Sequence, residues 1–128
     1  MLRRAAATPG LDAPAYRVAR PTARAAAREN GIDALLKDRR LDAIVSLTQG
    51  PAWLVDPVSG DNDSGNCTSP AAVSGYPHIT VPAGFHRGLP IGLSFFGPAF
   101  SEPTLLRFAS GFEHVAAARR PPRFLPSV

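Results

Sequence analysis

Two short apolar runs joined by a glycine-rich turn constrain the fold of this chain more than any other feature. The first run, Ile79–Val81, lies between Pro77 and Pro82, and the second run, Ile91–Phe96, ends at Gly97. Apolar runs of this length between Gly and Pro are typical of buried strands between tight turns. Because proline has no backbone N–H, the first strand must be short or lie where its N–H groups are not all needed. The sequence therefore predicts two consecutive strands here.

A long helix with an interruption is expected before these strands. Asp12 can cap it, with Pro14 in its first turn, and the alanine-rich run ends at the helix-stop pair Asn30-Gly31. Pro21 lies inside this run. Since proline removes a helical hydrogen bond and costs about 3 kcal/mol inside a helix, we expect a kink or break there, with Thr22 capping the second half.

The remaining elements follow from periodicity and punctuation. We expect a second helix over residues 32–40, a strand over 41–47 and a long loop over 49–68 that contains several Gly and Pro residues. Loops of this length are usually functional or disordered. After the two strands, Ser101 is expected to cap an amphipathic helix, which Pro121-Pro122 stop. The apolar residues of this helix recur at helical spacing: Leu105, Phe108, Ala109, Phe112, Val115 and Ala116. The fold class is α/β, with a partial mixed sheet flanked by helices.

Charge and composition limit the classes of partner. The net charge is +4, and Lys37 is the only lysine, so all other cations are arginine. Arginine can bind phosphate, but aromatic residues are not interleaved with these arginines, and we expect no nucleic-acid partner. No apolar run approaches the roughly 18 residues of a membrane span. Cys67, the only cysteine, excludes an internal disulfide and suits a reducing compartment, so we expect a cytoplasmic location.

Ordered blocks of sequence run along the chain from near Asp12. They are Gly31-Ile32-Asp33, Leu41-Asp42-Ala43, Gly50-Pro51-Ala52-Trp53, Ala83-Gly84-Phe85, Leu89-Pro90-Ile91-Gly92-Leu93, Phe96-Gly97, Ser101-Glu102 and Arg119–Pro126. As a set, these blocks resemble the C-terminal part of the amidase signature family, hydrolases that cleave carboxamides with a Ser, cis-Ser, Lys triad. The resemblance implies that residues 12–128 form the C-terminal piece of the amidase signature fold and that residues 1–11 form an N-terminal arm.

The resemblance also implies that the catalytic groups are missing from this chain. The family carries its catalytic lysine and its serine-rich signature far upstream, and no segment here matches either. Lys37 lies on a predicted helix beside Asp38 and Arg39, a solvated setting in which a lysine keeps its proton. In the intact family one serine attacks the amide carbonyl, while Lys and the cis-Ser relay protons. This chain would supply pocket wall and sheet support, and we expect it to be inactive alone.

Three alternatives stay open at this point. The chain is a C-terminal fragment of an amidase, a non-catalytic scaffold or interaction module, or one chain of a split amidase. Its expected partner is the N-terminal amidase portion or a similar chain, and a small amide is the substrate only of the complete enzyme. The few strands cannot build the broad sheet of the family, so at least one edge and one apolar face should lie open.

No catalytic residue, metal site or cofactor is predicted. Ser74 and His78 could be imagined as a pair, but no acid in this block would orient the imidazole. The run from Asp61 to Asn66 is similar to a calcium loop, yet its twelfth position is Ala72 instead of the bidentate Glu. Candidates for the pocket wall lie in the loops that flank the family-like block: Trp53, Asp61, Asn62, Ser64, Cys67 and His78. Trp53 could equally cover the core.

Overall fold

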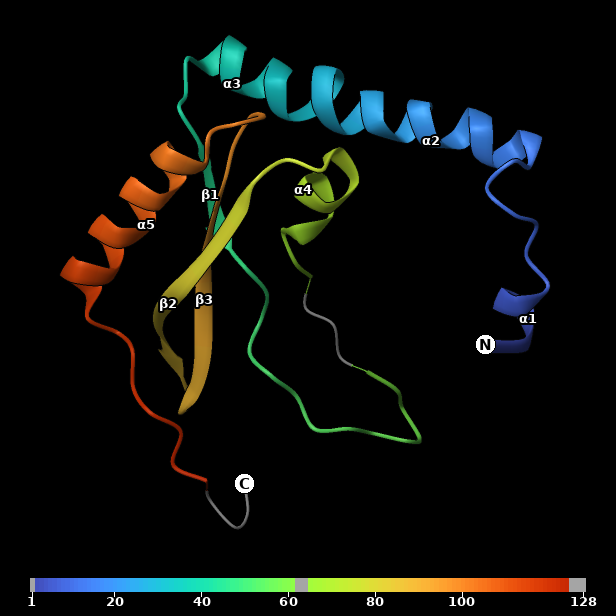
Figure 1. Ribbon diagram of the computed structural model, residues 1–128. Helices are drawn as coiled ribbons and strands as arrows, with labels where there is room; N and C mark the ends of the chain where they lie inside the picture. Colours follow the sequence, from blue (N-terminus) through green and yellow to red (C-terminus); the bar gives the residue numbers. More distant parts are fainter. Residues whose placement is uncertain (1, 62–64, 125–128) are drawn as a thin grey trace.

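The fold is a small antiparallel sheet with helices on both of its faces. The structure, a computed structural model, describes residues 2–61 and 65–124. Its elements in chain order are α1 (Leu2–Ala6), α2 (Pro14–Ala27), the π-helical turn η1 (Arg28–Ile32), α3 (Asp33–Arg39), β1 (Ile44–Leu47), α4 (Thr68–Ser74), β2 (His78–His86), β3 (Leu89–Phe96) and α5 (Glu102–Ala116) (Figure 1).

The predicted strand pair is confirmed and forms a hairpin. β2 and β3 pair antiparallel, and β1 pairs with the other side of β3, so the strand order is β1-β3-β2. Arg87 and Gly88 connect the hairpin with φ of 51° and 85°. Positive φ at both residues of a two-residue connection matches the right-handed twist of the strands. Pro82 lies in β2 next to a register shift between Pro82 and Gly84, and β2 is an edge strand, which is where a strand tolerates proline.

α5 covers one face of the sheet. Leu105 and Ala109 are buried there against Val81 and Phe95, and Phe108 and Phe112 pack beside them. The prediction that this helix presents its apolar stripe to the sheet is confirmed. Two details are corrected. Val115 is 85% exposed and Ala116 is also exposed, because the stripe leaves the sheet after Phe112. Ser101 occupies the N-cap position, but its hydroxyl donates to the carbonyl of Pro98 (2.8 Å) and makes no capping bond.

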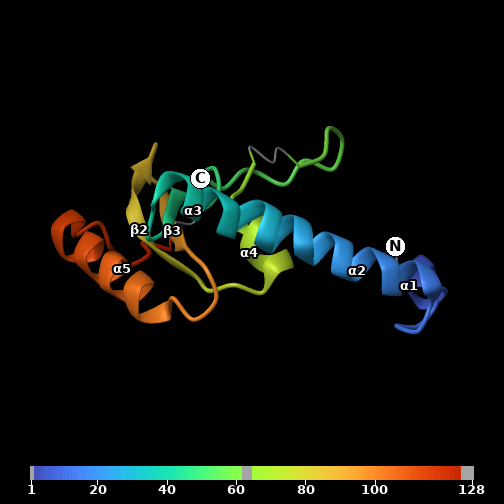
Figure 2. The same cartoon turned by 90° about the horizontal axis from the view of Figure 1, so that it is seen from above.

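The opposite face packs against η1, α3 and α4. Ile32, Leu36, Ala71 and Phe96 form a second buried cluster, with Ile44, Cys67 and Tyr76 at its border. The long helical segment formed by α2, η1 and α3 crosses one end of the sheet (Figure 1). Seen from above, α2 extends well beyond the sheet and carries α1 at its far end (Figure 2).

The expected break at Pro21 is wrong, because α2 runs without interruption from Pro14 to Ala27. Pro21 deprives the carbonyl of Arg17 of its helical partner, but both residues are exposed, so water can bond to that carbonyl. Thr22 does not cap a second half. Its hydroxyl donates to the carbonyl of Val18 (2.9 Å) within the same helix. Asp12 does not cap the helix either, since the N-cap position is Ala13 and no side chain caps it.

The expected stop at Asn30-Gly31 is also wrong. The helix continues through η1 into α3 and ends at Arg40, which has a φ of 52°. A Cβ on Gly31 would lie 2.6 Å from the carbonyl oxygen of Ala26. Gly31 therefore allows the wider π-helical turn to form where a larger residue would collide with the preceding turn. The predicted helix over 32–40 is confirmed as α3.

Two further boundaries differ from the sequence-based expectation. The strand expected over 41–47 begins only at Ile44. The loop expected over 49–68 ends where α4 begins, and α4 was not predicted. α4 has a proline at its third position and ends at Gly75, which has a φ of 73°. A seven-residue helix of small residues has a weak periodic signal, and its stability comes from packing of Ala71 and Ser74 into the core.

Candidate functional site

The candidate site lies on the sheet face opposite α5. On this face three hydroxyls meet, one from β2, one from β3 and one from Thr48, the residue that follows β1. The Ser94 hydroxyl lies 2.8 Å from that of Thr48 and 3.0 Å from that of Thr80. Ser94 is fully buried, Thr48 is half-buried and Thr80 is exposed. The three hydroxyls therefore form a polar floor in the sheet that reaches solvent on one side.

Gly92 makes this floor possible. A Cβ on Gly92 would lie 2.7 Å from both the hydroxyl oxygen of Thr48 and the methyl carbon of Thr80. The close approach of these side chains thus requires a residue without a Cβ. Sequence reasoning missed this cluster. The signal was present as the spacing of two between Gly92 and Ser94, which places both on one face of a strand.

The long loop begins and ends at this floor. The amide of Thr48 donates to the carbonyl of Gly92 (2.9 Å), and the amide of Cys67 donates to the carbonyl of Thr48 (3.2 Å). Gln49 and Asn66 form an isolated bridge one step further along. The side-chain oxygen of Asn66 also accepts bonds from the amide and the hydroxyl of Thr68, the first residue of α4. The two ends of the loop are therefore held together beside the sheet.

Trp53 and Asp61, two of the predicted wall residues, are brought together within this loop. The indole Nε1 of Trp53 donates to Oδ1 of Asp61 (3.3 Å). Trp53 also lines a hollow of about 370 Å³ with Gln49, Gly50 and Ala52. It belongs to neither buried cluster, so its indole does not cover the core formed by the described residues. The predicted wall residues Asn62 and Ser64 lie outside the described residues.

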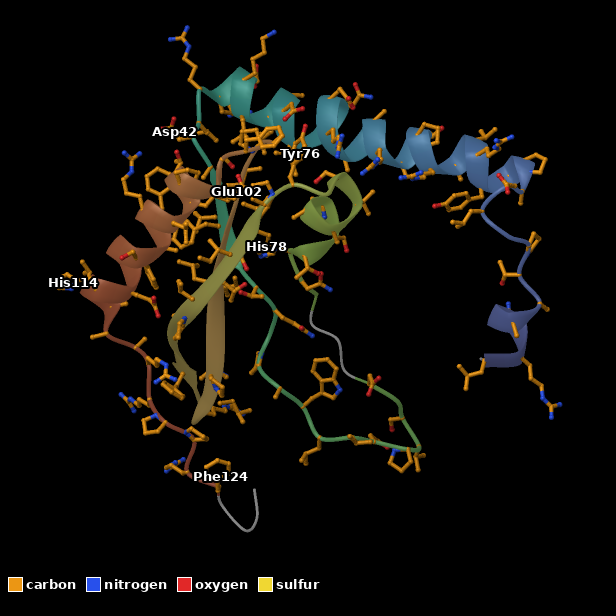
Figure 3. All side chains as sticks on the ribbon, viewed as in Figure 1. Asp42, Tyr76, His78, Glu102, His114 and Phe124 are labelled. Atoms are coloured by element: carbon orange, nitrogen blue, oxygen red, sulfur yellow. The ribbon has the colours of Figure 1, made fainter. Side chains whose placement is uncertain are left out.

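Cys67 and His78 lie closer to the core, near the buried cluster that contains Phe96. Cys67 is half-buried and packs against the cluster that contains Phe96. The His78 ring is 5.6 Å from the Phe96 ring, and its Nε2 is buried without a hydrogen-bond partner among the described residues. This burial lowers the pKa of His78, because a charged imidazolium would lose solvation there. Figure 3 labels His78 beside β2, of which it is the first residue, and Tyr76 closer to the long helical segment.

Ser74 and Lys37, the serine and the lysine weighed above as catalytic candidates, lie in environments unsuited to catalysis. Ser74 is fully buried, its hydroxyl donates to the carbonyl of Ala71 (3.1 Å), and it accepts a bond from the amide of Tyr76 (3.2 Å). No bond joins Ser74 to His78 in the described part of the chain. Lys37 is exposed on α3, as expected. A serine that cannot reach solvent and has no base beside it cannot serve as a nucleophile.

Within residues 2–61 and 65–124, no group of three or more His, Cys, Asp or Glu side chains could hold a metal ion. Among the same residues, no helix has the length and apolar character that crossing a bilayer requires. The three hydroxyls, Trp53, Asp61, Cys67 and His78 can offer neutral hydrogen-bonding and aromatic contacts, together with one carboxylate. Such a set can bind and orient a polar organic molecule.

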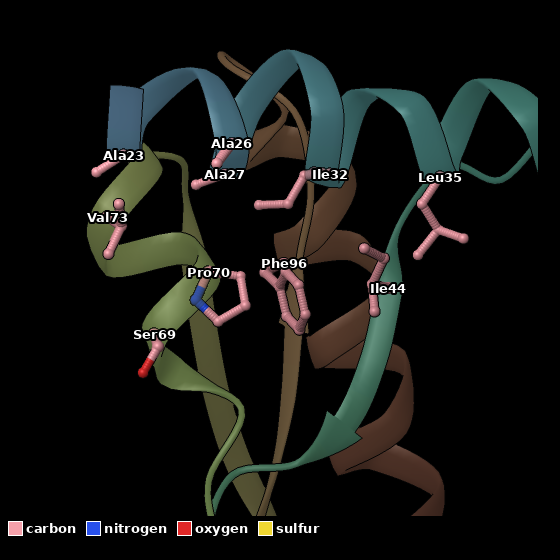
Figure 4. Close-up of a pocket in the computed structure, with 11 residues that line it drawn as sticks. Ala23, Ala26, Ala27, Ile32, Leu35, Ile44, Ser69, Pro70, Val73 and Phe96 are labelled. Carbon is pink, nitrogen blue, oxygen red and sulfur yellow. The ribbon is translucent and has the colours of Figure 1, made fainter. Parts of the chain in front are cut away.

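An apolar groove opens on the same sheet face, between α4, β1 and the long helical segment. It encloses about 550 Å³. Figure 4 shows Ala23, Ala26 and Ala27 on one side, Val73 and Pro70 on another, and Phe96 at its base. Ile32, Leu35 and Ile44 complete the apolar wall beside β1. Among the described residues, no charged side chain lines this groove.

The solved structures of amidase signature proteins share this α/β fold. The family model named Amidase matches residues 9–106. The chain belongs to the amidase family.

Individual relatives show how much of the family this chain spans. A probable amidase of Arabidopsis thaliana is 39% identical over 97 residues, which are 75% of this chain and 16% of that protein. A glutamyl-tRNA(Gln) amidotransferase subunit of Rubrobacter xylanophilus is 47% identical over 53 residues, 41% of this chain and 11% of that protein. The crystal structure of the native peptide amidase of Stenotrophomonas maltophilia superposes with a TM-score of 0.84 and 50% identity over 96% of this chain and 24% of that one. The chain thus spans a quarter or less of each of these proteins.

Proposed function

We propose that this chain forms part of the substrate pocket and central sheet of an amidase that hydrolyses carboxamides, and that it acts with the N-terminal portion of an amidase. That portion would contribute the lysine and the two serines of the catalytic triad. The chain itself would contribute no group that attacks the amide. It would act in a cytoplasmic enzyme.

One observation carries the proposal. Over the 96% of this chain that superposes on about a quarter of a peptide amidase, the two sequences are 50% identical and the backbones agree at a TM-score of 0.84. An isolated binding module that kept only the fold would have no reason to retain this degree of sequence identity. The same relative supports a peptide-like carboxamide as the substrate class.

The polar floor and the loop suggest how the chain would contribute. A peptide carboxamide has an amide group that donates and accepts hydrogen bonds and an apolar side chain next to it. Thr80 and Thr48 can exchange hydrogen bonds with the amide, and the Trp53 indole offers an aromatic surface to the side chain. We propose that Trp53, Asp61, Asn62, Ser64, Cys67 and His78 form the wall around that substrate.

A need for a partner is supported by the relatives and by the chemistry of this chain. One relative is named as a subunit of an amidotransferase, a name that implies further chains in that protein. Ser74, which lies four positions before His78 in sequence, is inaccessible here. We propose that the partner is the N-terminal three quarters of an amidase, either as a separate chain or as a continuous one.

Reconstitution tests this function. The chain would be co-expressed with the part of the Stenotrophomonas maltophilia peptide amidase that lies outside the superposed quarter. Release of ammonia from a peptide amide would be measured for each chain alone and for the co-purified pair, together with labelling by a serine-reactive fluorophosphonate. We expect turnover and labelling only in the pair, with the label on the partner.

Two controls make the result decisive. In the pair, replacing the partner's signature serines by alanine should abolish turnover and leave the complex intact. Turnover by the isolated chain, lost in Ser74→Ala, would contradict the proposal. A stable pair without any turnover would favour the non-catalytic scaffold.

A further inference from the structure

The two edges of the described sheet differ in chemistry. Between β1 and β3, hydrogen-bonded and non-hydrogen-bonded residue pairs alternate along the strands. The Thr48 amide donates to the Gly92 carbonyl, so Thr48 and Gly92 form a hydrogen-bonded pair, whereas the adjacent pair, Leu47 and Leu93, is not hydrogen-bonded. Residues paired like Thr48 and Gly92 bond to each other, and the residues between them point their backbone groups outward. The N–H and C=O groups of Val45 and Leu47 therefore point away from β3, towards the open edge of β1.

The opposite edge is blunted. The same alternation places the backbone N–H position of Pro82 on the outer side of β2, and proline has no N–H to offer there. The register shift that follows Pro82 bends the strand further. Proline and a bulge are two of the devices by which natural sheets prevent an edge from pairing. The outer edge of β2 is thus poorly suited to pair with a further strand.

β1 has none of these devices. Its residues, Ile44–Leu47, include no proline and no charged side chain. α5 packs on β2 and β3 and leaves β1 uncovered, so Val45 and Leu47 are 55% and 56% exposed. On the other face, Ile44 lies in the wall of the apolar groove together with Leu35, which is also exposed. β1 therefore offers open backbone groups, and apolar side chains on both sides of them.

We propose that β1 is the edge at which this sheet continues into a partner, by addition of an extended segment from the N-terminal portion of an amidase. The inference rests on the proposed function and specifies the surface that it uses. The segment pairs with the backbone of Val45 and Leu47, and neighbouring apolar residues of the partner cover Leu35 and Ile44 at the rim of the groove. An uncharged, apolar segment fits, because neither β1 nor the described wall of the groove presents a charge.

Two features support this occupant over others. The superposed peptide amidase has about three quarters of its length outside the region that this chain spans, which is ample sequence to supply a strand and a cover for the groove. A second copy of this chain could pair here only through the same four-residue strand. Ile44 belongs both to β1 and to the wall of the groove, so a single partner can contact the strand edge and the groove together.

Hydrogen exchange with mass spectrometry on the co-purified pair directly tests whether β1 pairs with a strand of the partner. We expect the amides of Val45 and Leu47 to exchange about tenfold more slowly in the pair than in the isolated chain. The amides of Glu113 and His114, two exposed residues of α5, serve as the internal control and should not change. Protection of β1 that rises with concentration in the isolated chain would identify a second copy as the occupant and overturn the proposal.

A pair of matched substitutions gives an independent measurement. Val45→Lys places a charge beside the joint, whereas Val115→Lys makes the same change at an exposed position of α5. Val45→Lys should weaken binding of the partner by about tenfold or more, and Val115→Lys should not. Thermal unfolding of each isolated variant shows whether it is folded. If Val45→Lys does not fold, the exchange experiment on the unsubstituted chain decides whether β1 is the edge that pairs with the partner.

The outcomes separate this inference from the proposed function. A pair that forms and hydrolyses the amide, with no protection of Val45 and Leu47 and no effect of Val45→Lys, would overturn the inference and leave the function standing. Absence of any complex or turnover with the unsubstituted chain would overturn both. Protection at β1 in a pair without turnover would support the joint and contradict the catalytic role.

Discussion

The phenol of Tyr76 donates a 2.8 Å hydrogen bond to Oδ2 of Asp33, and this bond joins the approach to β2 with the first residue of α3. The guanidinium of Arg28 lies 5.1 Å from the centre of the same ring, while its Nε donates to the carbonyl of Ser74. Residues more than forty positions apart thus fix the π-helical turn against the end of α4. Desolvation, and then the bond to Asp33 and its charge, raise the pKa of Tyr76.

Tyr76→Phe should therefore lower the free energy of unfolding by about 1 kcal/mol at neutral pH, because Asp33 loses its donor. A phenol whose pKa is higher in the folded chain stabilises the fold fully below pH about 10, and that contribution is lost as pH rises through the folded pKa. The difference between wild type and Tyr76→Phe should thus shrink above pH about 10. Urea unfolding at neutral and alkaline pH measures it. Tyr16→Phe, on the exposed part of α2, is the matched control and should show no such change.

The pKa of His78 is shifted in the opposite direction to that of Tyr76, and its effect on stability appears at acidic pH. Burial lowers its pKa, so the folded chain favours the neutral imidazole, and this stabilisation is present above pH about 6.5 and lost as pH falls through the folded pKa. His78→Phe removes the titrating group and keeps an aromatic ring beside Phe96. This variant should lose less stability than wild type between about pH 7 and pH 5, as followed by thermal unfolding.

The control for His78 is His114, which lies exposed on α5 (Figure 3). His114→Phe should leave the acid dependence of unfolding as it is in wild type. Equal acid dependence in wild type and His78→Phe would show that the imidazole is solvated in the folded chain.

The sheet and α5 could be predicted from the sequence because their signals are local. Pro82 marked a strand with N–H groups that are not all needed, and β2 is an edge strand. The apolar spacing from Leu105 to Phe112 is enough to orient α5. The helix-breaking signals at Pro21 and at Asn30-Gly31 gave wrong predictions. At Pro21 the carbonyl that loses its partner is open to solvent, and at Gly31 the missing Cβ lets the turn approach the Ala26 carbonyl closely.

The candidate site was less predictable for a physical reason. The hydroxyls of Thr48, Thr80 and Ser94 are far apart in sequence, and only the strand register brings them within hydrogen-bond distance. The bond between Trp53 and Asp61 depends in turn on how the loop is closed at Thr48 and Cys67. Contacts that require long-range pairing leave no periodic signal in one sequence.

The contribution of α5 to stability follows from which of its residues are buried. Leu105 is almost fully buried against the sheet, and Phe112 meets Phe95 edge-on with ring centres 6.2 Å apart. Leu105→Ala should lower the free energy of unfolding by about 2–5 kcal/mol, and Phe112→Ala should also destabilise the chain strongly. Glu113→Ala, next to Phe112 but exposed, should change it by about 0.5 kcal/mol or less. Chemical denaturation of the three variants measures this order, and a Glu113→Ala cost as large as that of Phe112→Ala would mean that the face is misassigned.

Trp53 distinguishes a pocket wall from a merely structural loop. In the reconstituted pair, Trp53→Ala should raise KM for a peptide amide by about tenfold with kcat little changed, because a wall contact binds the substrate and its transition state alike. Asp61→Ala should act in the same direction and more weakly, since it removes a smaller wall residue and releases the Trp53 indole that Asp61 now holds. Leu54→Ala, at the exposed neighbouring position, is the control and should leave KM unchanged. Steady-state kinetics and partner affinity would be measured on the same preparations. A fall in affinity for the partner with no change in KM would mean that Trp53 belongs to the contact between the chains, and the pocket wall would then have to be built from the residues around Thr80 and His78.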